Sequence, residues 1–263
     1  MTVDAHCHAS THWYEPIDTL LYAMDRCSVD RAVLVQMLDS TDSTDMIAAR
    51  RAHPDRLRFI AAIDPAAPDA VCALDTAVAA GAVGLRMRST WRSAGTDPLD
   101  LWRAIAGAGL CVSMVGPASS FIDGSLTEIA TACPDLTIVL EHLGGLARPD
   151  VGDRDALLPL VCAIAVHPNI ALKVTGLGQV APKRPDLDEA TPPLDLAAVP
   201  QLFGAIIAAF GANRLMWGSD FPPVAAREGY ANALGWTRAL FEQNWPETVT
   251  DIFGGNAVRT FGW

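Results

Sequence analysis

Short runs of apolar residues recur along the chain, and each is followed by a segment in which apolar residues have helical spacing. Most of the runs are continuously apolar, which is typical of strands covered on both faces of a sheet. We predict eight strands, over residues 3–8, 31–36, 57–63, 82–87, 110–115, 136–142, 170–174 and 214–220. The intervening segments predict helices, over residues 18–27, 45–53, 68–80, 99–108, 124–133, 156–167 and 199–210.

Strands that alternate with helices at a spacing of about 30 residues are typical of βαβ units and a parallel sheet. Eight such units in 263 residues match a closed (β/α)8 TIM barrel, formed by a single domain over residues 1–263. An open, doubly wound sheet is the alternative, but no GxGxxG turn follows the first strand. The longest irregular segment, residues 176–193, follows the seventh strand, so we expect it on the active-site face as a lid or an excursion.

The composition indicates which binding partners and which cellular compartment to expect. Hydrophobic residues make up 51% of the chain, and the formal net charge is −11, which argues against nucleic acid as a partner because that binding needs a basic surface. No apolar run is long enough for a membrane span, and the N-terminal residues do not resemble a signal peptide. The six cysteines have no CxxC spacing and are expected to be reduced core thiols. We therefore expect a cytoplasmic protein, and a homo-oligomer is compatible with the sequence.

Polar residues stand at the ends of predicted strands, where a TIM barrel places its catalytic groups. His6 and His8 are two residues apart on the first strand, so their side chains share a face and converge, as two metal ligands or two donors to a substrate do. Asp220 ends the eighth strand, two residues after Gly218, and His142 ends the sixth. Asp220 could instead be the N-cap of the next segment, but its occurrence together with the histidine pair favours a catalytic or ligand-binding role.

Two charged residues near the strand ends have competing interpretations. Arg86 on the fourth strand is predicted to point inward, where a guanidinium needs an anionic or carbonyl partner. That partner is either a substrate or a buried carboxylate such as Asp4 or Asp220. Glu141 is predicted to point away from the mouth, between the sheet and the helices, and to form a structural ion pair.

Three further residues could reach the same pocket. Lys173 alternates with apolar neighbours on the seventh strand, so it lines the pocket or pairs with a barrel carboxylate, and we favour the structural interpretation. His12 follows the first strand and Trp91 follows the fourth. With their neighbours they form either an aromatic wall over the pocket or local packing within loops.

The motifs at the strand ends resemble the amidohydrolase superfamily. They are VDAHCH at residues 3–8, EHLG at 141–144 and WGSDFP at 217–222. In addition, GLR at 84–86, KVTGL at 173–177 and FGGNA at 253–257 are similar to the amidohydrolase-2 group of TIM-barrel hydrolases, which includes sugar-acid lactonases and 2-pyrone-4,6-dicarboxylate lactonase. The resemblance spans residues 3–261.

The resemblance also bears on a metal cofactor. Many members of the superfamily carry a fourth-strand lysine or glutamate that bridges two metals, where this chain has Arg86. Mononuclear members often use a histidine at the end of the fifth strand, where this chain has SMVGP at 113–117. A binuclear site is therefore not expected. Two options remain, a metal-free site, which we favour, and one Zn²⁺ or Mn²⁺ ion held by His6, His8 and Asp220, with or without His142.

The resemblance implies a hydrolase that opens the ring of a lactone, and the basic residues near the mouth favour a carboxylated, anionic small-molecule substrate. Asp220 would act as general base on the attacking water. The carbonyl would be polarised by His142, His6 and His8. The substrate would be bound by Arg86 and Arg88, beside Trp91 and His12.

Two other functions stay open. The first is a metal-dependent, non-oxidative decarboxylase of an aromatic or muconate-type acid, against which the missing fifth-strand histidine argues. The second is a barrel that binds a ligand without turning it over, against which the retained Asp220 and first-strand histidines argue.

Overall fold

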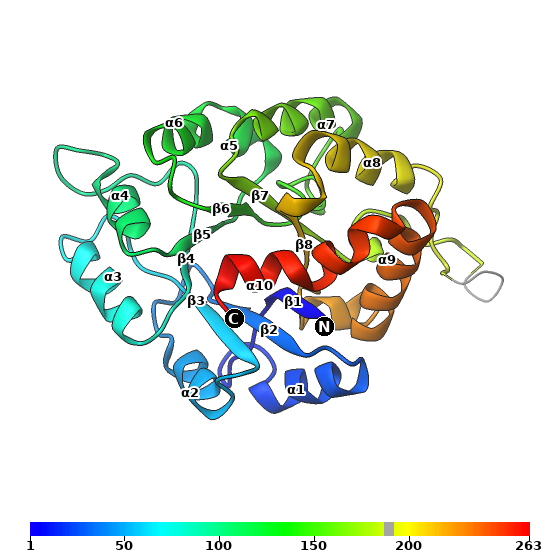
Figure 1. Cartoon of the computed structure of the whole chain (residues 1–263), viewed down its shortest axis with the longest axis horizontal. Helices are drawn as coiled ribbons and strands as arrows, with labels where there is room; N and C mark the ends of the chain where they lie inside the picture. Colours follow the sequence, from blue (N-terminus) through cyan, green and yellow to red (C-terminus); the bar gives the residue numbers. More distant parts are fainter. Residues whose placement is uncertain (187–191) are drawn as a thin grey trace.

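Eight parallel strands form one sheet in which each strand pairs with its neighbour in the sequence, from β1 to β8. The structure is a computed structural model and describes residues 1–186 and 192–263, so residues 187–191 of the irregular segment at 176–193 lie outside the described residues. A parallel bridge from Cys7 to Phe221 connects the two edges of the sheet. The predicted single-domain TIM barrel is thereby confirmed (Figure 1).

The strands begin close to their predicted positions, and several end earlier. Their bounds are β1 Val3–Cys7, β2 Arg31–Val35, β3 Leu57–Ala61, β4 Gly84–Met87, β5 Cys111–Met114, β6 Ile138–Leu140, β7 Ile170–Val174 and β8 Leu215–Trp217. The sixth and eighth predicted strands were too long, because β6 stops two residues before His142 and β8 stops three residues before Asp220.

Helices α1 to α9 surround the sheet in the order of the sequence, and α10 lies across the barrel (Figure 1). They are α1 Ile17–Arg26, α2 Thr44–Ala52, α3 Ala70–Ala79, α4 Asp100–Gly107, α5 Ala118–Ile122, α6 Ser125–Ala132, α7 Arg154–Ala163, α8 Val199–Phe210, α9 Tyr230–Asn244 and α10 Asn256–Phe261. Each of the seven predicted helices overlaps one of these, whereas α5, α9 and α10 were missed. No helix of the described residues is long and apolar enough to cross a membrane.

Two hydrophobic clusters show which way the strand residues point. The inner cluster takes residues from seven strands, and Ala257 and Phe261 of α10 pack against it. In Figure 1 this helix lies across the barrel. The outer cluster joins the other face of the strands to the surrounding helices. Since both faces of the sheet are covered, the strands are buried along nearly their whole length, as their continuously apolar sequences predict.

A register shift in β1 decides the direction of its histidines. Val3 and Ala5 belong to the inner cluster, yet Cys7 belongs to the outer one, because the pairing with β2 shifts between Asp4 and Cys7. An extra residue in one strand reverses the alternation of side chains beyond it. His6 and His8 therefore face the barrel interior, while Asp4 faces outward.

The expectation for the cysteines is corrected in part. The six cysteines are all unpaired, but only Cys7, Cys111 and Cys133 are buried and Cys72 is exposed, so the prediction of core thiols holds for half of them.

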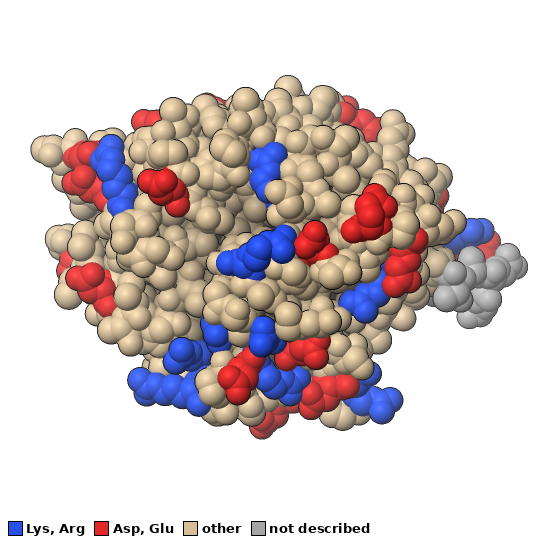
Figure 2. Space-filling view, viewed as in Figure 1, with Lys and Arg blue, Asp and Glu red and all other residues tan. Residues whose placement is uncertain are grey.

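On the face shown in Figure 2, lysine and arginine side chains are interspersed with aspartate and glutamate. The described residues of this face therefore form no continuous basic surface.

Candidate active site

Three histidines and one aspartate meet at the carboxyl ends of the strands. The imidazole centroid of His6 lies 4.9 Å from that of His8 and 5.2 Å from that of His142. Asp220 directs Oδ1 toward the first two, 3.8 Å from His6 Nε2 and 3.7 Å from His8 Nε2. The structure thus brings together the four residues predicted to be catalytic.

The junction of β1 and β8 holds two of these residues in place. The buried carboxylate of Asp4 accepts hydrogen bonds from the backbone N–H and the hydroxyl of Ser219, at 2.9 and 2.6 Å, and from the hydroxyl of Tyr230 at 3.0 Å. The backbone N–H of Asp220 donates to the carbonyl of His6 at 2.8 Å. The Asp4 carboxylate therefore joins β1, which carries the two histidines, to the segment after β8, which carries Asp220.

Close backbone approach explains Gly218. A Cβ atom at this position would lie 2.6 Å from Cβ of His6 and 2.9 Å from its backbone nitrogen, so only glycine fits. After it, Asp220 adopts the left-handed conformation with φ of 60°, and His142 does the same with φ of 50°. These turns aim both side chains at the site although neither residue is in a strand.

The second oxygen of Asp220 is occupied by two donors from neighbouring loops. Gln179 donates to Oδ2 at 2.7 Å, and Arg227 donates to the same oxygen at 3.3 Å. Burial by itself would raise the pKa of Asp220, but hydrogen bonding to His8 and the charges of His142, His8 and Arg227 outweigh it and lower the pKa. The carboxylate is therefore ionised at neutral pH, with Oδ1 directed toward His6 and His8.

A chain of buried polar groups lies behind His6. Arg86 donates through Nε and Nη2 to the two carboxylate oxygens of Glu141, at 3.0 and 2.7 Å. Ser113 donates to Glu141 Oε1 at 2.7 Å, and Lys173 Nζ lies 2.7 Å from the Ser113 hydroxyl and 2.9 Å from His6 Nδ1. All five side chains are buried. They form one continuous network from the interior of β4 to the cluster of histidines.

Burial and charge set the ionisation of this network. Burial alone would raise the pKa of Glu141, but the charges of Arg86 and Lys173 and the hydrogen bonds from Arg86 lower it. Burial lowers the pKa of Lys173 to about 8, with Glu141 opposing the shift. Burial and the nearby positive charge of Lys173 lower the pKa of His6 well below its usual value. The site therefore contains a carboxylate, an ammonium and a neutral imidazole in contact.

Two predictions about this region are corrected. Glu141 does not lie between the sheet and the helices. Val139 belongs to the inner cluster, so Glu141, two residues later, also faces inward. The buried carboxylate that pairs with Arg86 is Glu141, and not Asp4 or Asp220. The third donor of Arg86, Nη1, is taken by the carbonyl of Gln36 at 3.1 Å, so its role in binding a substrate stays a prediction.

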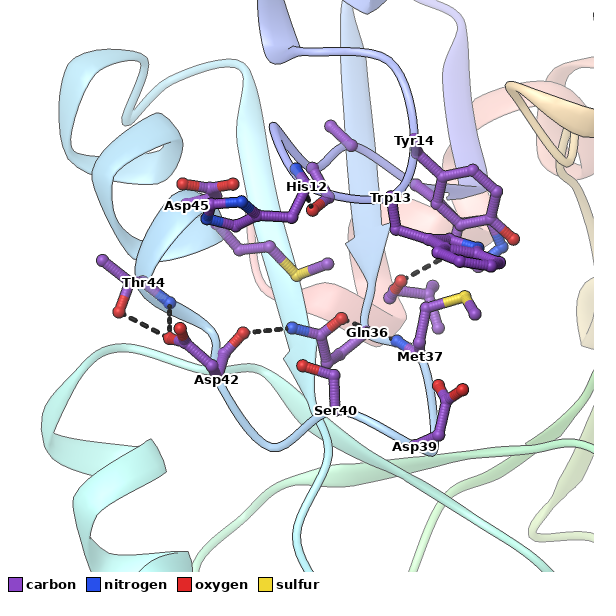
Figure 3. A pocket seen from close by; sticks show the side chains of 15 residues that line it. His12, Trp13, Tyr14, Gln36, Met37, Asp39, Ser40, Asp42, Thr44 and Asp45 are labelled. Carbon is purple, nitrogen blue, oxygen red and sulfur yellow. Dashed lines mark hydrogen bonds between the residues drawn. The ribbon is translucent and has the colours of Figure 1, made fainter.

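A pocket of about 270 Å³ opens beside His8, between the loops that follow β1 and β2 (Figure 3). The ring of Tyr14 stacks on that of His8, with centroids 5.1 Å apart, and His12 lines the pocket as well. Arg88 and Trp91 are not among its lining residues. Arg88 is exposed, and Trp91 packs against the outer cluster, which matches the local-packing alternative.

The residues that line this pocket have a consistent chemistry. Three carboxylates are present, and neither lysine nor arginine is among the residues that line it. Hydroxyl groups and the aromatic side chains of Trp13 and Tyr14 complete the walls (Figure 3). The carboxylates belong to Asp39, Asp42 and Asp45. The pocket is therefore acidic, in contrast to the histidine, lysine and arginine side chains around Asp220.

Several residues of the site were not found by sequence reasoning. Ser113, Gln179 and Arg227 were overlooked, and Lys173 was assigned a mainly structural role. A lysine and a serine at inward positions of β7 and β5 were the available signals for two of them. Gln179 and Arg227 lie in loops, where the sequence has no periodicity that predicts direction.

The cluster contains donor atoms that suit a divalent cation. His6, His8 and Asp220 offer ligand atoms within 4.8 Å of one another, and so do His6, Glu141 and His142. His6 Nε2 is buried and has no hydrogen-bond partner among the described residues. Imidazole and carboxylate donors fit Zn²⁺ or Mn²⁺, so the first group matches the predicted metal ligands.

Comparison with known proteins agrees with this geometry. A model of the amidohydrolase family matches residues 3–263. The chain belongs to this family. The predicted resemblance is therefore confirmed across the barrel.

One curated relative and two solved structures are similar to the chain. The chain is 34% identical over 144 residues to L-fucono-1,5-lactonase from Burkholderia ambifaria, and the match covers 52% of this chain but only 45% of that protein. An amidohydrolase structure from Burkholderia multivorans has a TM-score of 0.78 at 18% identity and covers 99% of each chain. A probable 2-pyrone-4,6-dicarboxylic acid hydrolase from Acinetobacter baumannii has a TM-score of 0.74 at 20% identity, covering 100% of this chain and 99% of that one. At these identities the two structures establish the shared fold.

Proposed function

We propose that this amidohydrolase hydrolyses the ester bond of a lactone ring. The observation that carries the proposal is the ionised carboxylate of Asp220, whose Oδ1 lies 3.7–3.8 Å from two histidines. The three side chains are therefore close enough to contact the same small group from one side. The similarity to L-fucono-1,5-lactonase supports the choice of a lactone as substrate.

The reaction follows from the roles of four side chains. Water attacks the carbonyl carbon while Asp220 accepts its proton, and a tetrahedral oxyanion forms. His142, His6 and His8 surround the position where this negative charge develops and stabilise it. The intermediate then collapses, the ring C–O bond breaks, and Asp220 returns the proton to the leaving alkoxide. The product is an open-chain hydroxy acid.

A metal ion is compatible with the same residues. His6, His8 and Asp220 would hold it, and when bound it would polarise the carbonyl and lower the pKa of water.

The pocket beside His8 favours a hydroxylated lactone over a carboxylated one. Its three aspartates would repel the carboxylate of an anionic substrate, whereas their oxygens can accept hydrogen bonds from the hydroxyl groups of a neutral one. The aromatic wall of Trp13 and Tyr14 offers an apolar surface for the carbon skeleton. We therefore propose a neutral lactone that carries hydroxyl groups in place of the anionic substrate expected from the sequence.

Turnover of a panel of hydroxylated and carboxylated lactones tests the proposal, with acid release followed by a pH indicator. Replacing Asp220→Asn is expected to lower kcat/KM by about 10²–10⁴-fold, the usual contribution of a general base. Asp75→Asn, an exposed aspartate on α3, serves as the matched control. Lactone hydrolysis that survives in Asp220→Asn would contradict the role assigned to this residue, and absence of hydrolysis throughout the panel would contradict the function.

A further inference from the structure

A second carboxylate, that of Glu228, is buried in the loop that follows β8. Its side chain is only 2% exposed. Oε2 accepts a hydrogen bond from Nε of Arg227 at 3.3 Å, and Oε1 accepts one from the backbone N–H of Gly178 at 3.2 Å. A guanidinium nitrogen and a peptide nitrogen only donate, so the direction of each hydrogen bond is fixed. Glu228 therefore joins the loop that follows β7 to the loop that follows β8.

Two glycines in the loop after β7 make room for this carboxylate. A Cβ atom at Gly176 would overlap Oε1 of Glu228 and lie 2.8 Å from Cβ of Ala233, and a Cβ atom at Gly178 would overlap Oε2 of Glu228. Neither glycine has φ in the left-handed region, so the backbone conformation alone does not require glycine at these positions. The loop is thus shaped around the Glu228 side chain.

Each of the two loops that Glu228 joins also carries a donor to the same oxygen of Asp220. Gln179 directly follows Gly178, and its side chain donates to Asp220 Oδ2 at 2.7 Å. Arg227 directly precedes Glu228, and its Nη1 donates to the same oxygen at 3.3 Å. The guanidinium of Arg227 therefore lies between two carboxylates, with Nε on one and Nη1 on the other.

We propose that Glu228 is a positioning residue for Asp220, in a role that rests on the proposed lactone hydrolysis. By fixing the loops that carry Gln179 and Arg227, it keeps two donors on Oδ2 and leaves Oδ1 directed at the reacting water. The last torsion of an aspartate side chain is soft, so a carboxylate without such donors rotates easily. A general base has to lie within hydrogen-bond reach of the proton that it accepts, so its orientation bears directly on the rate.

The Glu228→Gln variant tests this role, with the lactone that the wild type hydrolyses fastest as substrate. The amide keeps an oxygen for the Gly178 N–H, but its NH2 group cannot accept from Arg227. We expect kcat per folded molecule to fall about 10–10²-fold, since misplacing a reacting group by about 1 Å has an effect of this size. KM should change by less than about twofold, because Glu228 acts through its neighbours and does not bind the substrate.

A control and a double variant separate positioning from stability. Glu242→Gln, at an exposed position of α9, should retain the kcat of the wild type. In Asp220→Asn the base is already absent, so adding Glu228→Gln should leave the residual kcat per folded molecule unchanged. A role confined to stability predicts no loss of kcat once the folded fraction is measured by urea unfolding. A wild-type kcat in Glu228→Gln, or a fully additive loss in the double variant, overturns the proposal.

Amide hydrogen exchange at Gly178 tests the anchoring of the loop without a substrate. We expect slow exchange in the wild type, and exchange about tenfold or more faster in Glu228→Ala, as the loss of a hydrogen bond to a charged group predicts. Rapid exchange of Gly178 in the wild type overturns the proposal even if neither variant folds. Absence of turnover by the wild type contradicts the proposed function instead, whereas turnover that Glu228→Gln leaves intact contradicts only the role of Glu228.

Discussion

Replacing Glu141→Gln is expected to destabilise the fold by about 3–5 kcal/mol, because the change breaks a buried ion pair and leaves its cation uncompensated. The carboxylate has no exposed side-chain surface, accepts two hydrogen bonds from Arg86 at 3.0 and 2.7 Å, and accepts a third from Ser113 at 2.7 Å. The amide keeps one accepting oxygen, so one N–H of Arg86 faces another donor. Against a total stability of about 5–15 kcal/mol, this loss is large.

Urea unfolding followed by tryptophan fluorescence measures the loss. Glu128→Gln is the control, because Glu128 also forms an ion pair with an arginine, Arg92, but its side chain is 52% exposed. Solvent screening should keep its effect within about 1 kcal/mol. Equal effects of the two substitutions would refute the reasoning that burial makes the Arg86–Glu141 pair critical. The double variant Arg86→Met with Glu141→Leu should regain much of the stability, since it removes both charges together.

Two further outcomes follow from the same geometry. The pKa of Glu141 is lowered from its ordinary value of 4.5, so its ionised form stabilises the fold above that pH, and this stabilisation should be lost as the pH falls below it. The melting temperatures of the wild type and of Glu141→Gln should therefore converge in acid. A difference between them that stays constant with pH would contradict the lowered pKa. Gly218→Ala should cost about 1–3 kcal/mol and lower kcat, because the added methyl group meets His6 at 2.6 Å; unchanged unfolding midpoints and turnover would show that the strand junction tolerates it.

The architecture was predictable because the same hydrophobic pattern repeats along the chain. Eight apolar runs alternate with helical segments, and each predicted strand overlaps an observed one. The candidate site was predictable for a related reason. All strands of a parallel barrel end at the same side, so polar residues at the ends of different strands must meet. His6, His8, His142 and Asp220 could therefore be grouped from their positions alone.

The direction of individual side chains was predictable only where alternation holds. Alternation correctly places Arg86 inward. The prediction for Glu141 was wrong because it took His142, the next residue, as the inward end of the strand. The chain leaves the β conformation after Leu140, and His142 reaches the site through a left-handed turn. In β1 the register shift between Asp4 and Cys7 has no local sequence signature.

The sequence by itself determined the barrel, the end of the barrel at which the candidate site lies, and the four side chains at the centre of that site. Hydrophobic periodicity and strand ends are local properties of the chain. Only the tertiary structure decided which oxygen of Asp220 stays free, which carboxylate pairs with Arg86 and which residue contacts His6 Nδ1. These contacts join residues as far apart as His6 and Lys173, separated by 167 positions. Hydrogen-bond partners are selected by proximity in space and by the donors and acceptors that burial leaves available, and neither is written in the local pattern.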